Sequence, residues 1–215
     1  MSLVNINPAQ AINNVINFDD IVTNVSGVAP VPSQYQNLYW LSNGGPNSGF
    51  EVIANSAWTG QFNYNNSPGA PSAPNGVLNV GIVTVSRVGG GLFTFKEAYF
   101  APFTSNNNYL NSQGSTANTI TVRGYNGVNF VGSANLTFAA AGYVPLTQDI
   151  ANITSLVITG TSTNPQVPDT GTRWAMDNFT YEPVAVPLES DAQPFVAAIA
   201  FFAVGTWWKK RSIQK

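Results

Sequence analysis

Short apolar runs separated by turn-forming residues make up the chain between residues 12 and 183. No segment there keeps the 3.6-residue apolar period of an amphipathic helix. Runs rich in β-branched and aromatic residues instead end at clusters of Gly, Pro, Asn and Ser, a pattern that predicts strands joined by loops. The expected strands cover residues 15–21, 38–41, 50–53, 77–88, 92–103, 119–125, 129–138, 156–159 and 174–181.

Asn126 and Gly127 stand between two of these runs and form the strongest hairpin signal in the chain, because type I′ turns favour Asn followed by Gly. Eight or more short strands in about 170 residues favour two sheets packed face to face. No internal repeat is visible, which counts against a propeller or a β-helix. We therefore predict an all-β, two-sheet, jelly-roll-like sandwich, followed by a linker and one C-terminal hydrophobic helix.

The C-terminal segment has a different pattern, with an unbroken apolar run of 14 residues from 195 to 208. As a helix it would be about 21 Å long, shorter than the ~30 Å hydrocarbon core of a bilayer. It has no polar face, it ends in Trp207 and Trp208, and a basic membrane stop of Lys209, Lys210 and Arg211 follows. We expect a membrane helix with the body outside the cytoplasm; the alternative is a final helix buried in the core.

The polar motif in front of this run is Val186, Pro187, Leu188 and Glu189. Motif, apolar segment and basic end together resemble the PEP-CTERM class of bacterial sorting signals, whose motif reads Val-Pro-Glu-Pro. This chain carries a variant of that motif. The resemblance implies two partners: an exosortase-type processing enzyme and the membrane lipid around the helix.

The N-terminal residues 1–11 are expected to be the remnant of a signal peptide. Ala9-Gln10-Ala11 has the A-x-A form of a signal-peptidase site, and cleavage there would leave Ile12 as the first mature residue. On this interpretation the true start lies upstream. The alternative is an ordinary polar N-terminus that contains this pattern by chance.

Five segments follow from these patterns. They are the signal remnant 1–11, a β-sandwich domain 12–183, a sorting motif and linker 184–194, a membrane helix 195–208 and a basic cytoplasmic end 209–215. We expect an exported protein that is anchored in the membrane with its body outside, or that reaches the cell surface or extracellular space after processing.

Composition narrows the possible functions. Charged residues make up 8% of the chain, against about 25% in typical soluble domains. Half of the eight basic residues lie in the last seven positions, so the body lacks the basic stripe that nucleic-acid binding needs. The chain has no Cys and no His, which excludes a disulfide scaffold, thiolate zinc sites and a Ser-His-Asp triad.

The body carries a second resemblance. Residues 17–21 read Asn-Phe-Asp-Asp-Ile, residues 35–40 read Tyr-Gln-Asn-Leu-Tyr-Trp, Tyr125 lies in a Gly-Tyr hairpin, and residues 175–179 read Ala-Met-Asp-Asn-Phe. These motifs are similar to those of secreted β-sandwich proteins that carry the same tails. The first and last strands look like those of carbohydrate-binding jelly rolls. The resemblance implies the fold, and an extracellular polysaccharide as a partner.

Asp19, Asp20 and Asp177 are the candidate metal ligands. The first and last strands of a jelly roll often lie side by side, which would bring these carboxylates together. Ca²⁺ takes six to eight oxygen ligands and needs no His, and the resemblance to calcium-bearing carbohydrate modules supports that ion. Asp177 is the favoured ligand of the three. The alternative is that the carboxylates cap loops or accept hydrogen bonds from backbone amides.

Aromatic residues are the candidate ligand-binding groups. Those gathered before residue 65 include Tyr35, Tyr39, Trp40, Trp58, Phe62 and Tyr64. Trp58, Phe62 and Tyr64 lie among Gly, Asn and Pro, so we expect them in exposed loops, where flat rings can stack on sugars. The alternative is that these rings fill the core, which is the fate expected for Trp40 and Trp174.

Together these observations predict a non-enzymatic envelope or extracellular-matrix protein that binds glycans or adheres. The alternative is a secreted carbohydrate-active hydrolase that uses a carboxylate pair about 5 to 9.5 Å apart. Its candidate carboxylates are Glu51, Glu97, Asp149 and Glu182, and no spacing singles out a pair.

Overall fold

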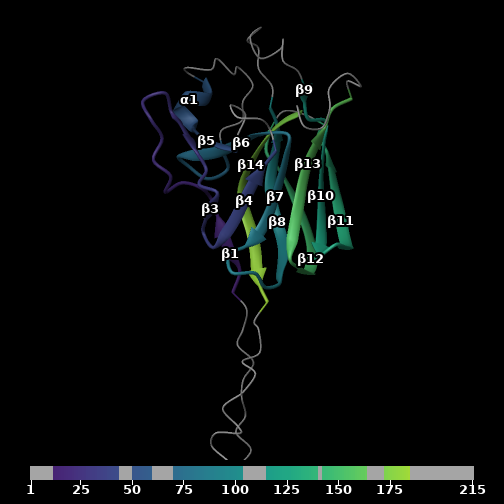
Figure 1. Ribbon diagram of the computed structural model, residues 1–215. Helices are drawn as coiled ribbons and strands as arrows, with labels where there is room; N and C mark the ends of the chain where they lie inside the picture. The colour runs from purple at the N-terminus through teal and green to yellow at the C-terminus, as the bar shows by residue number, and fades with distance from the viewer. Residues whose placement is uncertain are drawn as a thin grey trace, which may run out of the picture. The chain divides into compact units, whose positions relative to one another are not determined.

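The computed structural model describes residues 12–43, 50–59, 70–103, 115–139, 142–163 and 172–184. Strands make up most of this part of the chain and form two sheets (Figure 1). The predicted all-β class is therefore confirmed. The predicted sorting motif, membrane helix and basic end belong to residues 185–215, which lie outside the described residues. Within the described ranges, no helix is both long and apolar enough to cross a membrane.

Sheet A has eight strands, and its pairs are antiparallel except for β9 with β14. The strand order across it is β12 (Val144–Ile153), β8 (Phe93–Pro102), β14 (Thr172–Pro183), β6 (Asn75–Val80), β5 (Glu51–Ala54) and β2 (Val28–Pro30). The short strands β1 (Asn14–Ile16) and β9 (Ser115–Thr116) also pair with β14. A short helix, α1 (Asn55–Thr59), follows β5.

Sheet B has six strands, and all of its pairs are antiparallel. Their order is β11 (Asn129–Thr137), β10 (Thr119–Asn126), β13 (Ser155–Thr161), β7 (Ile82–Arg87), β4 (Leu38–Ser42) and β3 (Gln34–Tyr35). The predicted hairpin at Asn126 and Gly127 is confirmed, because it joins β10 to β11 and Gly127 adopts the left-handed φ of +60°.

Both sheets contribute to one hydrophobic core, which is the arrangement of a β-sandwich. Trp40 of sheet B and Trp174 of sheet A are both buried in it, as expected. Trp40 stacks on Phe50 at 5.2 Å and meets Phe179 edge to face at 5.2 Å. Buried aromatic rings of this kind each stabilise a fold by about 1.5–3 kcal/mol.

The first and last strands lie side by side, since β1 pairs with β14 from Asn14 opposite Tyr181 to Ile16 opposite Phe179. The predicted strand 15–21 is shorter than expected, because the chain leaves β1 at Ile16 and turns at Phe18, whose φ is +61°. This turn directs the Phe18 ring into the core, where it is fully buried. The residues after it lie beside the start of β6.

The structure also divides one predicted strand and adds a long strand that the sequence pattern did not predict. The predicted run 77–88 is divided at Gly81, with φ of +89°, into β6 of sheet A and β7 of sheet B. Strand β12 was not predicted at all. Two register shifts against β8 space its buried residues Leu146, Ile150 and Ile153 at intervals of four and three, so the two-residue alternation of a strand is lost.

Candidate functional site

The outer face of sheet B is the surface that the described strands present most regularly. On each strand, buried core residues alternate with residues directed outward, as the pleat of a strand requires. The outward residues, which we call the sheet B outer face, are Tyr39, Leu41, Ile82, Thr84, Ser86, Thr119, Thr121, Arg123, Tyr125, Phe130, Ser133, Asn135, Thr137, Ser155, Val157, Thr159 and Thr161.

Hydroxyl and amide groups on this face are aligned across strands by the register. Thr121 pairs with both Asn135 and Thr159, and its Oγ1 donates to Asn135 Oδ1 at 2.7 Å. The hydroxyls of Thr119 and Thr137 are 3.3 Å apart in the next row. Since neighbouring strands are about 4.8 Å apart, these groups form a regular polar grid.

One row of this grid has an aromatic ring at each end. Tyr125 is opposite Ser155, Ser155 is opposite Ser86, and Ser86 is opposite Tyr39, so three strand spacings, or about 14 Å, separate the two tyrosines. Phe130 extends the row onto β11, where its ring meets Tyr125 edge to face at 6.0 Å. Phe130 is 59% exposed and Tyr39 is 37% exposed. We call this set the aromatic row.

The sheet B outer face is almost uncharged. Among the described strands of sheet B, Arg123 is the one charged residue directed outward, and it is exposed. A ligand that lies on this face therefore meets hydroxyls, amides, ring faces and the aliphatic side chains of Leu41, Ile82 and Val157. These groups suit a neutral, hydroxyl-rich molecule, with a single cation available for an acidic substituent.

Asp177 lies on the other sheet, fully buried in β14. Its Oδ2 accepts hydrogen bonds from the backbone N–H and the Oγ–H of Ser72, both at 2.8 Å, and its Oδ1 accepts from the N–H of Asn178 at 2.7 Å. Burial raises the pKa of Asp177 to about 6, although these hydrogen bonds act in the opposite direction; the nearby charge of Asp19 raises it further.

Asp19 approaches the same region from the segment after β1. Its Oδ1 accepts from the backbone N–H of Asn75 at 3.0 Å, and the side-chain amide of Asn75 donates to the carbonyls of Phe18 and Ile21 at 3.1 and 3.0 Å. The structure thus brings Asp19 and Asp177 close enough to interact electrostatically. Both carboxylates have the backbone amide partners that the alternative interpretation expected.

Asp20 is directed elsewhere. It accepts hydrogen bonds from the Tyr35 hydroxyl and, at 3.3 Å, from Nε2 of Gln36. The structure therefore places two of the three predicted metal ligands together and separates the third. Among the described residues, no group of three acidic side chains is arranged to hold a metal ion.

Tyr143 is a neighbour of this region that the sequence did not reveal. Its hydroxyl is buried and, in the part of the chain that the structure describes, makes no hydrogen bond. Burial raises the pKa of Tyr143, and the charge of Asp177 raises it further. A Cβ atom on Gly76 would lie 2.8 Å from this hydroxyl, so the ring reaches β6 only because residue 76 has no side chain.

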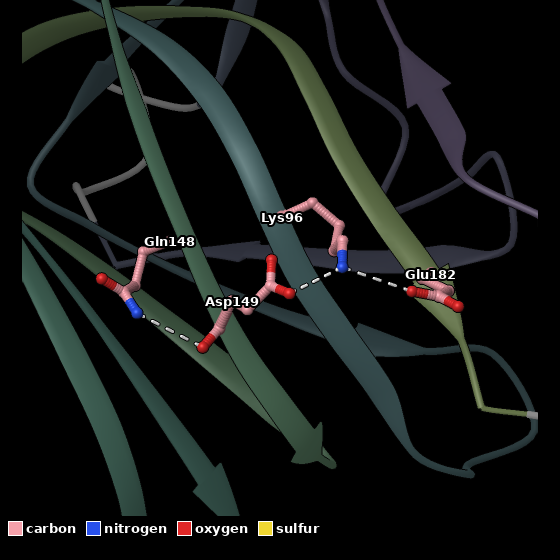
Figure 2. Close-up of polar contacts among 4 residues, drawn as sticks. All are labelled: Lys96, Gln148, Asp149 and Glu182. Carbon is pink, nitrogen blue, oxygen red and sulfur yellow. Dashed lines mark hydrogen bonds and ion pairs between the residues drawn. The ribbon is translucent and has the colours of Figure 1, made fainter.

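Two of the four candidate hydrolase carboxylates, Asp149 and Glu182, contact the same lysine of sheet A (Figure 2). Lys96 Nζ is 2.8 Å from Asp149 Oδ2 and 3.5 Å from Glu182 Oε2, and the hydrogen bond to Asp149 raises the pKa of Lys96. Glu97 accepts from Thr147 Oγ1 at 2.6 Å. These contacts link β8, β12 and β14, and the ammonium group between two carboxylates offsets part of their negative charge. Glu51 lies apart on β5, where burial raises its pKa.

The predicted ligand-binding aromatics are only partly covered by the structure. Trp58 belongs to α1, and its side chain lies outside the described residues. Phe62, Tyr64, the sorting motif Val186–Glu189 and the membrane stop Lys209–Arg211 all lie outside them as well. The aromatic row was missed, although Tyr39 had been considered among the aromatics before residue 65. Alternating Thr and Ser in residues 82–86, 119–121 and 155–161 was the available signal for this face.

No family model matches this sequence, and no curated protein is similar to it. The functional interpretation therefore depends on the residues and their geometry.

Proposed function

We propose that this chain is a non-enzymatic, exported envelope or extracellular-matrix protein that binds a neutral polysaccharide on the sheet B outer face. Its body would be a jelly-roll-like sandwich, an interpretation supported by the pairing of β1 with β14. The observation that carries the proposal is the aromatic row, which places Tyr39 at one end and Tyr125 with Phe130 at the other end of a neutral polar surface.

The chemistry of this surface supports a sugar ligand. Ring faces stack on the apolar faces of sugars, and hydroxyl and amide groups between the rings can exchange hydrogen bonds with sugar hydroxyls. The side chains are held on strands, so little conformational entropy is lost when the ligand binds. The near absence of charge among the described residues of this face favours a neutral polysaccharide over an acidic one.

The rival proposal is a hydrolase, and the arrangement of carboxylates gives it less support. Asp149 and Glu182 share Lys96, and Glu97 is bonded to Thr147. A glycosidase needs one carboxyl group that stays protonated beside a second that is ionised, both facing the substrate. No described carboxylate lies on the sheet B outer face.

The C-terminal segment supplies the proposed location. We infer from the Val186–Glu189 motif, the apolar run 195–208 and the basic end that this segment holds the body outside the cytoplasm. An exosortase-type enzyme and membrane lipid are the partners proposed for it. Retention at the surface would place the sheet B outer face where it can meet polysaccharide.

Calcium is proposed as a structural ion beside Asp19 and Asp177. Two carboxylates that lie close together in a buried region repel each other, and a divalent cation would relieve that repulsion. Both carboxylates keep acceptor capacity beyond the amides that they bind. Asp20 is not part of this proposal, because Tyr35 and Gln36 hold it.

A glycan array separates the two functions. The full chain in mild detergent is applied to arrayed neutral and acidic polysaccharides, and reducing ends released during incubation are measured in parallel. We expect binding to at least one neutral polysaccharide, unchanged between low and high salt, without release of reducing ends. Release would favour the hydrolase, and binding restricted to acidic polysaccharides would contradict the proposed neutral ligand.

A further inference from the structure

In the described part of the chain, the strand orders of the two sheets end in four edge strands, which differ in how their free sides are protected. A free edge strand exposes unpaired backbone N–H and C=O groups, and proteins usually protect such edges with short strands, proline, charge or bulges. In sheet A, β2 has three residues and ends at Pro30, and β12 contains Pro145, Asp149 and two register shifts. In sheet B, β3 has two residues. Each of these edges has at least one protective feature.

Strand β11 has few of these features. It lies at the edge of sheet B (Figure 1). Its nine residues include no proline and no charged residue. Its one register shift lies near its beginning, and from Gly132 to Thr137 it pairs one-to-one with β10. Val131 and Phe130 are 44% and 59% exposed, and Val128 in the preceding turn is 95% exposed. In the described part of the chain, no other strand pairs with its free side.

We propose that β11 is a self-association site at which a second copy of this chain adds its own β11 in antiparallel orientation. The sequence Asn-Phe-Val-Gly-Ser-Ala-Asn-Leu-Thr is neutral throughout, so two copies meet without repulsion between like charges. A strand that pairs with itself about a two-fold axis forms a closed dimer with an isologous interface. Backbone hydrogen bonds across it follow the pattern of strand addition.

The register of this pairing is the one in which the two copies of β11 overlap along their whole length. The nine residues overlap completely when the two-fold axis passes Ser133, so Ser133 faces its own copy and Gly132 faces Ala134 of the other copy. Ser133 is exposed and lies on the sheet B outer face. In this register the outer faces of the two copies join into one continuous surface. The two aromatic rows lie at different levels on this surface, because Phe130 faces Leu136 of the other copy and six residues of a strand span about 20 Å.

Cysteine cross-linking tests this register directly, because the native chain has no Cys. Residues directly opposite in an antiparallel pair have Cβ atoms about 4.5–5.5 Å apart, which small adjustments bring within disulfide range. The full-length variant Ser133→Cys is oxidised in mild detergent and analysed by non-reducing electrophoresis. The matched control is Gln148→Cys, an exposed position on β12, the edge strand of sheet A that lies beside β11.

We expect most of the Ser133→Cys chain to become a disulfide-linked dimer, at least tenfold more than for Gln148→Cys. Equal cross-linking of the two variants would overturn the proposal, since it would indicate random encounter or association through another segment. Melting temperatures measured under reducing conditions establish that both variants are folded. Binding of the monomer to polysaccharide is measured separately. A negative cross-linking result would therefore contradict self-association without contradicting the proposed glycan binding.

A charged variant provides an independent test. Ser133→Lys places two cations opposite each other across the two-fold axis, and we expect the dimer fraction in sedimentation experiments to fall at least tenfold. The control Thr161→Lys puts the same charge on β13, away from the edge. A dimer fraction unchanged by Ser133→Lys, or a native chain that remains monomeric, would overturn the proposal.

Discussion

At the scale of single residues, Asp177 is a carboxyl group in an environment far from its ordinary one. It is fully buried, three donors from Ser72 and Asn178 contact it, and the charge of Asp19 lies near it. The hydrogen bonds favour the ionised carboxylate, whereas burial and Asp19 favour the neutral acid. Burial and the charge of Asp19 together outweigh the hydrogen bonds, so the pKa of Asp177 is raised from 3.8 to about 6.

This raised pKa predicts how stability depends on pH in calcium-free buffer. Because the folded protein holds the Asp177 proton more tightly than the unfolded chain, stability from this group is fully present below pH 4 and is lost as the pH rises to about 6. The loss amounts to about 3 kcal/mol. Denaturant unfolding at several pH values measures it. In the variant Asp177→Asn this part of the pH dependence should be absent; an unchanged profile would contradict the assignment.

The sequence anticipated part of this residue cluster. The motifs containing Asp19 and Asp177 suggested that the two would meet, and the pairing of β1 with β14 brings them together. The sequence motifs did not show that Asp20 points away from Asp19 and Asp177, toward Tyr35 and Gln36. The left-handed backbone of Phe18 turns the chain, and the left-handed residues Gln36 and Asn37 shape the loop that holds Asp20. Such conformations leave little trace in a sequence when the residue is not glycine.

At the scale of elements, strands were predictable where burial alternates and hidden where it does not. Strand β10 alternates strictly, and its hairpin with β11 was recognised from Asn126 and Gly127. Strand β12 is an edge strand whose register shifts disturb its alternation. The boundary at Gly81 was concealed because the residues on both sides are apolar and β-branched, although they belong to different sheets.

The β10–β11 hairpin gives a prediction that contrasts two glycines. A Cβ on Gly127 would meet nothing within 4 Å, so Gly127→Ala costs only the strain of its left-handed backbone, about 1 kcal/mol. A Cβ on Gly124 would lie 2.4 Å from Ile150 Cγ2 and 2.7 Å from Ile153 Cγ2, so Gly124→Ala should cost about 1–3 kcal/mol.

Chemical denaturation of the two glycine variants beside the native chain measures both effects. Gly124→Ala should lose more free energy of unfolding than Gly127→Ala, because its new methyl group meets side chains that β12 packs into the core. The reverse order would show that turn geometry, and not packing between the sheets, limits the stability of this hairpin.

At the scale of the whole described domain, charge is divided between the two outer faces. The outer side of sheet A carries Lys96 with Asp149 and Glu182, and the buried Asp177 lies in the same sheet. The outer face of sheet B carries only Arg123 among its described residues. Composition predicted a weakly charged protein. Composition alone could not predict which face would be neutral. The distribution of charge over the two faces depends on which strands form each sheet, and the sequence did not show that β6 and β7 belong to different sheets.

Calcium removal tests the proposed structural ion at this scale. If the ion bridges Asp19 and Asp177, a chelator should lower the melting temperature of the native chain by several degrees at pH 7, and added Ca²⁺ should restore it. The variant Asp177→Asn should show little response to either treatment. Asp149→Asn, in the Lys96 cluster, is the matched control and should respond as the native chain does. A native melting temperature that the chelator leaves unchanged would refute the ion.

The central claim is that the aromatic row of sheet B binds polysaccharide. Its most direct test is the affinity of the full chain for the neutral polysaccharide found on the array, measured for Tyr39→Ala, Tyr125→Ala and the double variant. Each single change should weaken binding about tenfold, or ~1.4 kcal/mol, and the double change about a hundredfold. Val22→Ala, an exposed position off this face, should bind as the native chain does. A correctly folded double variant that binds with native affinity would contradict the account.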